Sequence, residues 1–183
     1  LFYTRVISVA DAMLGCEIQV PALDGAQRLK LDPGTQSGTV ERVSESSSGT
    51  EADRNSGTRT IDISADGRYV LFDSTAQNLV PGIEGNAGNK MFLHDRQTGV
   101  TEMITREDGT LAPSTSEGAI SGNGRYVAFS GGDFVAGEPA GVFVWDRTNG
   151  QVERLGAGPF AGHYEGMAVA ISDNGRHVAF TTS

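Results

Sequence analysis

Three histidines are the side chains best suited to acid–base chemistry in this 183-residue sequence, and they occur in unlike contexts. His94 takes the position that Trp145 holds in a related run, which favours a structural role. His177 replaces a tyrosine found in two related runs and is expected to be a strand residue. His163 lies in a glycine-rich stretch, residues 156–166, and is the best functional candidate of the three.

Repeated Asp-Arg pairs are the second group that could do charge chemistry. Asp95 and Asp146, each followed by an arginine, recur in register, which indicates a turn structure and not a catalytic pair. The sequence contains no Gly-x-Ser-x-Gly elbow, no His-Glu-x-x-His and no phosphate-binding loop. We therefore predict no catalytic residue, no cofactor-binding residue and a non-enzymatic function.

Metal and thiol chemistry are also disfavoured. A calcium loop needs several clustered oxygen ligands, whereas residues 83–90 offer one carboxylate, Glu84, beside Lys90. We expect this stretch to be an exposed, flexible loop without metal. The single Cys16 excludes an internal disulfide and a Cys-only zinc site. Because Cys16 alternates with polar residues, we expect a buried structural thiol.

The charge balance limits the partners. The formal net charge is −9, and the 14 lysines and arginines are scattered singly. A nucleic-acid partner requires a basic patch, and an anionic membrane is disfavoured by the same sign argument. No apolar run approaches the 18 residues of a membrane span. A protein or peptide, or a second copy of the chain, remains as the expected partner.

Two repeated runs must position these residues. Residues 63–72, 120–129 and 171–180 align without gaps at offsets of 57 and 51. Their Asp-Gly or Asn-Gly dipeptides tolerate positive φ and should close tight hairpins. A second element, residues 91–99, recurs at 142–150 and ends in a glycine that can be left-handed. Gly67, Gly124 and Gly175 are therefore predicted to hold positive φ.

The repeat predicts an all-β fold with four strands per unit. The strands are expected near residues 58–63, 68–73, 91–95, 100–105, 117–121, 125–130, 142–146 and 151–155. A further strand near 39–44 and two more in the last repeat bring the total to eleven. Four strands in about 50 residues is the period of a propeller blade. This count gives a partial β-propeller of about two and a half antiparallel blades. Its open edges, near 39–44 and 176–181, would expose Val178 and Phe180 and predict a homo-oligomer, with a dimer favoured.

The repeated motifs resemble those of TolB-type β-propellers. The resemblance covers the Ser-x-Asp/Asn-Gly-Arg-Tyr-Val-x-Phe run, the Leu-Val-Pro-Gly loop near Leu79 and the Asp-Arg-x-Thr/Asn-Gly turn. It extends from about Thr39 to Ser183, and residues 39–183 are expected to form one domain of propeller blades.

Residues 1–38 follow a different pattern and form the other expected domain. Ser8 can cap a short helix over residues 8–14, and two alternating strands follow at 16–21 and 27–31. The segment resembles the C-terminal β-domain of DnaJ chaperones, in its Ala-Leu-Gly-like, Glu-Ile-x-Val-Pro-x-Leu-Asp-Gly and Pro-Gly-Thr-Gln-Ser-Gly stretches, and the match is expected to end at Gly38. The His-Pro-Asp tripeptide of that family's J-domain is absent. The resemblance therefore implies a β-scaffold or a weak client-binding surface, and not co-chaperone activity.

The seam between the two patterns suggests a fusion. Residues 36–44 end the chaperone-like stretch and also imitate residues 97–105. Because the sequence begins at Leu1, it is expected to be a fragment, a processed form or an engineered protein.

The preferred function is a protein-binding or scaffolding module that completes its propeller by self-association. The alternatives are a non-catalytic part of a larger peptidase or glycan-active enzyme, and a client-binding fragment. The compartment stays open, because the first part suggests the cytoplasm and the second the periplasm or secretion.

Overall fold

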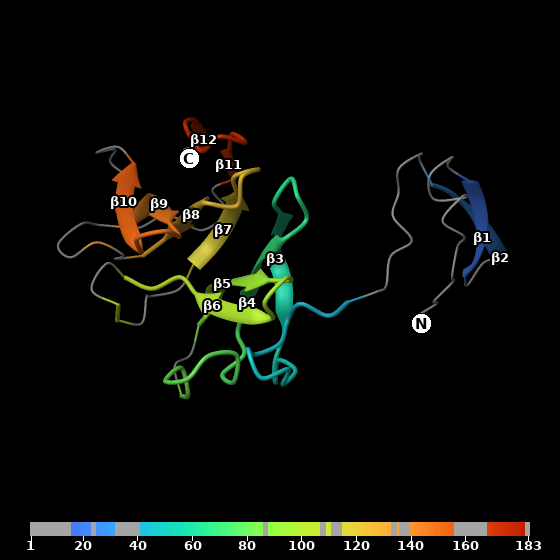
Figure 1. Cartoon of the computed structure of the whole chain (residues 1–183), viewed down its shortest axis with the longest axis horizontal. Coiled ribbons are helices and arrows are strands. Elements are labelled where there is room, and N and C mark those ends of the chain that lie inside the picture. Colours follow the sequence, from blue (N-terminus) through green and yellow to red (C-terminus); the bar gives the residue numbers. More distant parts are fainter. Residues whose placement is uncertain are drawn as a thin grey trace. The chain divides into compact units, whose positions relative to one another are not determined.

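The computed structural model describes residues 16–22, 25–31, 41–85, 88–106, 109–110, 115–132, 135, 140–155 and 168–181, with backbone alone for the first two stretches. The chain divides into two compact units, Leu1–Arg42 and Val43–Ser183. Every regular element in the described residues is a strand, so the fold is all-β as predicted (Figure 1). The helix expected over residues 8–14 lies outside the described residues. Within the described part, no helix is long and apolar enough to cross a membrane.

The described residues of the first unit form one antiparallel hairpin. Strand β1 (Cys16–Ala22) pairs with β2 (Gly25–Leu31), with Cys16 opposite Leu31 and Ala22 opposite Gly25. This pairing confirms the two predicted strands and extends each by one or two residues at the turn. Cys16 begins β1, but the prediction of a buried thiol concerns a side chain outside the described part.

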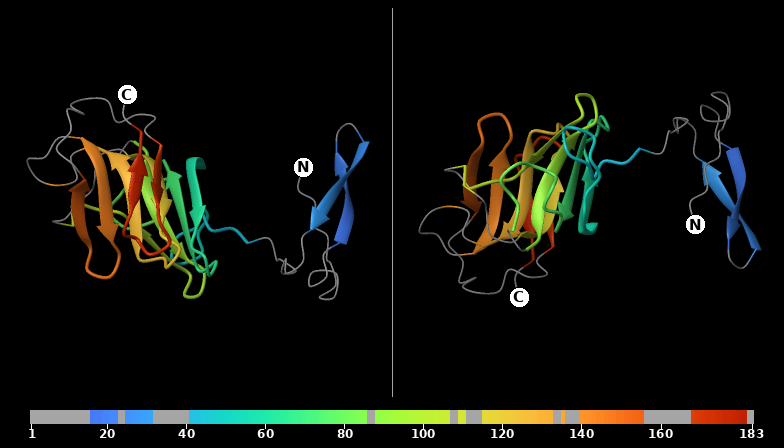
Figure 2. Two further views of the ribbon diagram at one scale, coloured as in Figure 1. Left: turned by 90° about the horizontal axis from the view of Figure 1, so that it is seen from above. Right: turned by 90° about the horizontal axis from the view of Figure 1, so that it is seen from below.

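The described residues of the second unit form two four-stranded antiparallel sheets and a hairpin, each in simple sequence order. Figure 1 shows the hairpin, the second sheet and the first sheet from top to bottom, and in the left view of Figure 2 the hairpin lies in front of the sheets. Sheet 1 consists of β3 (Ser56–Ile63), β4 (Tyr69–Ser74), β5 (Lys90–Asp95) and β6 (Val100–Met103). Sheet 2 consists of β7 (Thr115–Ile120), β8 (Tyr126–Gly131), β9 (Gly141–Asp146) and β10 (Gln151–Leu155). Hairpin 3 consists of β11 (Val169–Ile171) and β12 (Val178–Phe180).

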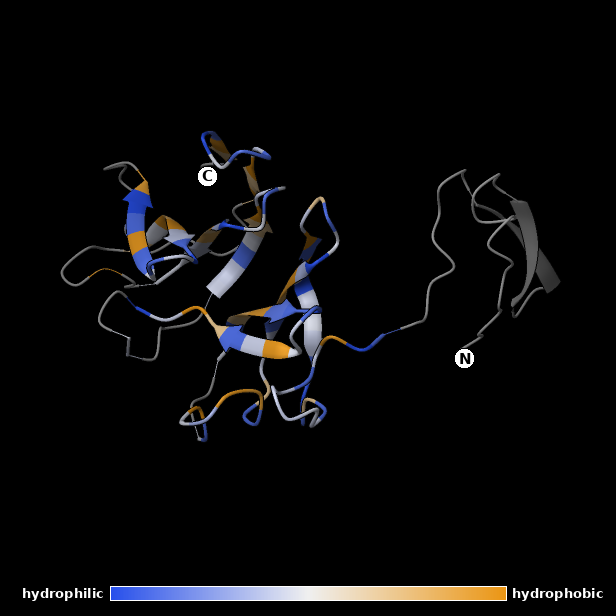
Figure 3. Ribbon diagram, in the orientation of Figure 1, coloured by the Kyte–Doolittle hydropathy of each residue, from blue (hydrophilic) through white to orange (hydrophobic). Residues whose placement is uncertain are grey.

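The two faces of each sheet can be named from the repeat, because successive side chains of a strand point to opposite faces. We call the face with the repeat tyrosine the front face, and the face with the repeat phenylalanine the back face. The front of sheet 1, including Tyr69 and Leu71, packs against the back of sheet 2, including Ile120 and Phe129, in one buried core. Strand β11 of hairpin 3 lies next in turn, against β7 and β8 of sheet 2. Strands β4 and β5 are buried along nearly their whole length because both faces of sheet 1 are covered there. Hydrophobic and hydrophilic residues both occur along the edge strands β6 and β10 (Figure 3).

Among the described residues of the second unit, the back of sheet 1 is covered by chain segments and not by another sheet. Phe72 and Phe92 stack with ring centroids 5.7 Å apart. They form a second buried cluster with Leu79 and Ile83 from the connection between β4 and β5. The expectation that residues 83–90 are an exposed loop is therefore wrong at both ends, because Ile83 and Lys90 are buried.

The strand expected at residues 39–44 is not formed by its described part. Residues 41–44 have no strand geometry, and the nearest pairing is a single bridge between Glu45 and Glu51. The Ser46 amide donates to the Thr50 carbonyl, and the Ala52 amide donates to the Ser44 carbonyl. These backbone groups are satisfied within a local turn, so they are not offered to a neighbouring strand.

Candidate functional site

The repeat turns share a hydroxyl relay that sequence reasoning missed. The Ser64 hydroxyl donates to Asp66 Oδ1 at 2.6 Å, and the Tyr69 amide donates to Ser64 Oγ at 3.0 Å. Asp66 Oδ1 also accepts from the Arg68 amide at 3.0 Å, and these hydrogen bonds, with the Ser64 contact the strongest, lower the pKa of Asp66. The other two turns repeat the relay through Ser121 and Asn123 and through Ser172 and Asn174. The three predicted left-handed glycines are confirmed, with φ of 70°, 67° and 72° at Gly67, Gly124 and Gly175.

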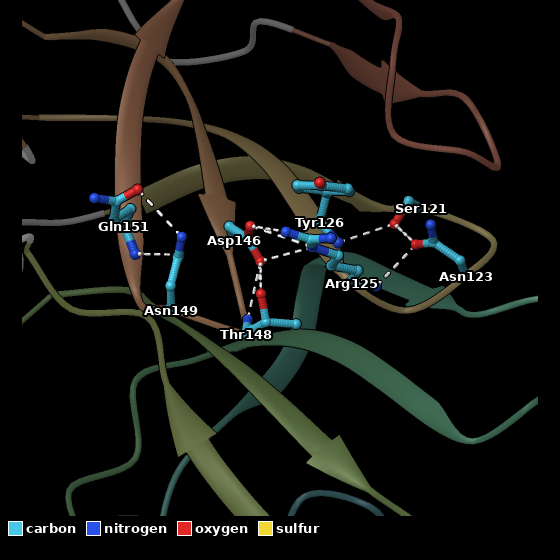
Figure 4. Close-up of polar contacts among 8 residues, drawn as sticks. All are labelled: Ser121, Asn123, Arg125, Tyr126, Asp146, Thr148, Asn149 and Gln151. Atoms are coloured by element: carbon cyan, nitrogen blue, oxygen red, sulfur yellow. Dashed lines mark hydrogen bonds and ion pairs between the residues drawn. The ribbon is translucent and has the colours of Figure 1, made fainter.

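An arginine of each complete repeat clips two strands together. Arg68 donates through Nε and Nη2 to the two oxygens of Asp95 at 2.9 and 2.7 Å. Arg125 holds Asp146 in the same way (Figure 4). Each aspartate also accepts from the amide two residues later, which confirms its predicted turn role. The signal for the clip was present in the sequence, because the arginine and the aspartate recur together in both units.

The clips determine the charge state of these aspartates. The hydrogen bond from Arg68 holds the pKa of the Asp95 carboxyl well below its usual range, although partial burial opposes the shift. Arg125 has the same effect on the pKa of Asp146. Both carboxylates therefore stay ionised at neutral pH, and neither can act as a proton donor or general acid there.

A ring-on-glycine contact joins one repeat to the next. A Cβ atom on Gly124 would lie 2.3 Å from the Tyr69 ring, and one on Gly175 would lie 2.1 Å from the Tyr126 ring. Arg147 of sheet 2 covers Tyr69 with its guanidinium carbon 4.2 Å from the ring centroid. Its Nε donates to the Gly124 carbonyl at 3.0 Å. The pair Asp146-Arg147 therefore supplies a carboxylate to its own sheet and a cation to the neighbouring one.

The three candidate histidines are not brought together. His94 is buried in sheet 1, with Nδ1 2.9 Å from the Thr101 hydroxyl. That hydroxyl donates its proton to the Glu45 carbonyl, so His94 Nδ1 carries the hydrogen of the pair. His177 is exposed and lies immediately before β12, in the slot that Tyr69 and Tyr126 hold elsewhere, so the expectation that it is a strand residue is wrong. His163 lies outside the described residues.

Sheet 1 also buries two charged groups. Asp73 is buried, which opposes its ionisation, but hydrogen bonds from the Thr60 and Arg59 amides and the Thr58 hydroxyl lower its pKa overall. These donors lie at the bulge of β3, whose register shifts between Ser56 and Ile61. Burial lowers the pKa of Lys90. Among the described residues, no group of three or more histidines, cysteines or carboxylates could hold a metal ion.

The edge strand β6 borders a cavity of about 490 Å³. The Thr101 amide of β6 donates to Ser47 Oγ at 3.0 Å, and the Ser47 hydroxyl donates to the Thr101 carbonyl at 3.3 Å. One serine side chain thus occupies the hydrogen-bonding groups that a neighbouring strand would use. The cavity is lined by hydroxyls on one side and apolar or amide side chains on the other: Ser46, Ser47, Ser48, Thr50, Gln77, Asn78, Leu79, Val80, Pro81, Glu84 and Thr101.

Comparison with known proteins supports the resemblance of the N-terminal segment. A family model described as the DnaJ C terminal domain matches residues 1–64. The chaperone protein DnaJ of Syntrophobacter fumaroxidans is 53% identical over 43 residues, which cover 23% of this chain and 11% of that protein. The corresponding protein of Roseiflexus sp. is 49% identical over 37 residues, covering 20% of this chain and 10% of the relative. The chain thus spans about a tenth of the length of these relatives. The family match continues past Gly38, where the resemblance was expected to end, into β3.

A solved structure is also similar to the chain. TolB from Acinetobacter baumannii aligns with a TM-score of 0.47 and 16% identity, over 97% of this chain and 46% of that one.

Proposed function

We propose that this chain is a non-enzymatic protein-binding module, in which a DnaJ-like segment (residues 1–38) precedes consecutive blades of a partial propeller (residues 39–183). The observation that supports this proposal is that the reactive side chains of the repeats are held in structural hydrogen bonds. Asp95 and Asp146 are held as anions by arginines, and His94 is buried against Thr101. These groups stabilise the sheets, so the repeats offer surfaces for binding and not a catalytic constellation.

The edge of β6 is the surface best suited to an extended protein segment. A peptide that adds to a sheet edge gains affinity from main-chain hydrogen bonds and specificity from pockets for alternate side chains. Thr101 provides the amide and the carbonyl, which the incoming segment would take over from the single hydroxyl of Ser47 that pairs with both of them. The adjoining cavity, with Leu79 and Val80 in its lining, would take one apolar side chain of the segment.

The chemistry of the segment follows from this geometry. The segment is extended, and it carries an apolar side chain next to the residue that pairs with Thr101. Its other side chains are polar. An unfolded or unstructured stretch of protein has this character. The chaperone proteins that match the N-terminal segment support the same class of partner.

The test is suppression of aggregation of a thermally unfolding reporter enzyme, followed by light scattering without ATP. We expect stoichiometric amounts of the chain to slow aggregation. Ser48→Trp, which fills the cavity from its exposed rim, should remove the effect. Glu153→Trp is the matched control, because Glu153 is exposed on β10, away from the cavity.

Two outcomes would contradict the proposal. Aggregation at the same rate with and without the chain would exclude binding of unfolded protein. Protection that Ser48→Trp leaves unchanged would exclude the cavity beside β6 as the binding surface.

A further inference from the structure

The junction between sheets 1 and 2 shows how one repeat covers the next. At this junction Ile120, on the back of sheet 2, is only 5% exposed. Its amide donates to Asp62 Oδ2 at 2.9 Å, and the Gly118 amide donates to Thr60 Oγ1 at 3.1 Å. Tyr69 lies over Gly124, and the Ala65 amide donates to the Gly122 carbonyl at 2.9 Å. A front face and a back face together therefore make a buried joint.

The back of sheet 1 presents the same positions without a covering sheet. Ile63 is equivalent to Ile120 in the repeat but is 52% exposed, and Ile61, equivalent to Gly118, is 72% exposed. Gly67 is equivalent to Gly124, yet a Cβ on Gly67 would meet no ring, only Arg96 Nη1 at 3.7 Å. These three residues form what we call the open back face. Two isoleucines so exposed on an otherwise polar strand mark an interaction surface.

Hairpin 3 presents the complementary front face. Exposure alternates along β11 and β12: Ala170, His177 and Ala179 are exposed, while Val178 and Phe180 are half-buried toward sheet 2. This corrects the sequence-based expectation that Val178 and Phe180 would be the exposed pair. By repeat position, His177 is equivalent to Tyr69 and Ala179 to Leu71. We call Ala170, His177 and Ala179 the open front face.

We infer that the open front face of one copy of this chain binds the open back face of a second copy, head to tail. The two open faces hold the repeat positions of both halves of a joint that the chain forms internally, which favours a second copy as the partner. His177 then lies over Gly67 of the partner copy, as Tyr69 lies over Gly124. The small Ala170 and Ala179 pack against Ile61 and Ile63.

The sizes of the facing side chains support this pairing. In the internal joint, Gly118 leaves room for Met91 of β5, whose atoms would lie 2.6 Å from a Cβ there. Hairpin 3 has no described third strand to supply such a side chain. Ile61 stands at the glycine position and fills that volume from the other side, so close packing is kept. This contact is separate from client binding at β6, and either can hold without the other.

A charge-pair experiment on the full chain tests the inference. We expect the light-scattering mass of the wild type to rise with concentration from 19.2 kDa toward at least twice that value. Ile63→Lys and Ala179→Glu should each keep the mass at one chain when alone, because a charge enters an apolar joint. An equimolar mixture of the two variants should associate again, because the unchanged front face of Ile63→Lys can bind the unchanged back face of Ala179→Glu.

Val100→Lys is the matched control, since Val100 is an exposed apolar residue outside both open faces, and it should associate as the wild type does. Circular dichroism checks that both charge variants keep the β-fold, and either one alone suffices if the other unfolds. A mass of one chain at every concentration would overturn the inference. So would an oligomer that Ile63→Lys and Ala179→Glu leave intact.

Discussion

The back faces of sheets 1 and 2 carry equivalent residues but have different neighbours. In sheet 2, Phe129 and Phe143 stack beneath the front of sheet 1, and Ile120 is buried with them. In sheet 1, Phe72 and Phe92 stack in the same way but lie beneath Leu79 and Ile83 of a connecting segment. That segment covers the phenylalanines but leaves Ile63 exposed.

This difference separates two kinds of information in the repeat. The motif itself determines the strands, the turns and the clip, because these are the same in both sheets. What covers the sheet depends on residues outside the motif. Substitutions at equivalent positions should therefore have equal effects within the sheets and unequal effects at the faces.

The largest difference is expected at the turn glycines. Forcing a branched residue into the left-handed region costs about 1–2 kcal/mol, and overpacking a tight contact adds about 1–3 kcal/mol. Gly124→Val meets both penalties because of the Tyr69 ring, whereas Gly67→Val meets only the first. Urea denaturation should show the larger loss of unfolding free energy for Gly124→Val. Equal losses would mean that Tyr69 does not pack on the glycine.

The equivalent isoleucines should differ next. Ile120→Ala should lower the free energy of unfolding by about 2–5 kcal/mol, the range for truncating a buried isoleucine. Ile63→Ala should cost less than half as much, since Ile63 is already half exposed. Denaturant unfolding at protein concentrations low enough to keep the chain monomeric measures both. A loss for Ile63→Ala as large as that for Ile120→Ala would show that the face of β3 is covered within a single chain.

The Ser47 hydroxyl bonds the edge strand β6 at Thr101. In sheet 2, Val152 stands at the repeat position of Thr101. Ser47→Ala should lower stability by about 1 kcal/mol, the typical value of one hydrogen bond. It should also speed hydrogen exchange at the Thr101 amide, with the Val152 amide as the internal reference. Unchanged exchange at Thr101 would show that Ser47 does not protect this edge.

The clips should give the smallest effect, and the same one in both sheets, because their arginines are well exposed. The folded pKa values of Asp95 and Asp146 are lowered, so each clip stabilises the fold above the unfolded aspartate pKa of about 3.9. This stability is lost as the pH falls below that value. Melting temperatures of Asp95→Asn and Asp146→Asn should lie slightly below wild type at pH 7 and approach it in acid. A gap that does not change with pH would mean that the carboxylate charge is not what holds the strands.

Most strands could be predicted because both repeated motifs occur in each of the two four-stranded units. Each predicted strand of the two sheets overlaps an observed one, and the ends differ by at most two residues at nearly every boundary. The dipeptides with glycine predicted positive φ correctly, because few other residues tolerate that conformation. The prediction of a strand that includes residues 41–44 was wrong. It rested on a similarity to residues 97–105, and such a similarity does not determine which groups the backbone amides bond to.

The site could be predicted only in part. The turn role of Asp95 was found from its spacing to Gly99, but its pairing with Arg68 depends on the register of β4 and β5. That register places Tyr69 opposite Asp95, which a single strand pattern does not reveal. The cavity beside β6 is lined by residues from two stretches, 46–50 and 77–84. The sequence alone does not show that these two stretches lie close together.

The contact of Arg147 with the Tyr69 ring bears on the order in which the chain folds during synthesis. Arg147 is encoded 78 residues after the ring it covers. At a ribosomal rate of about 5–20 residues per second, Tyr69 waits about 4–16 s for that cover. Sheet 1 therefore leaves the ribosome with its Tyr69 ring covered by Arg68 of the same repeat but not yet by Arg147.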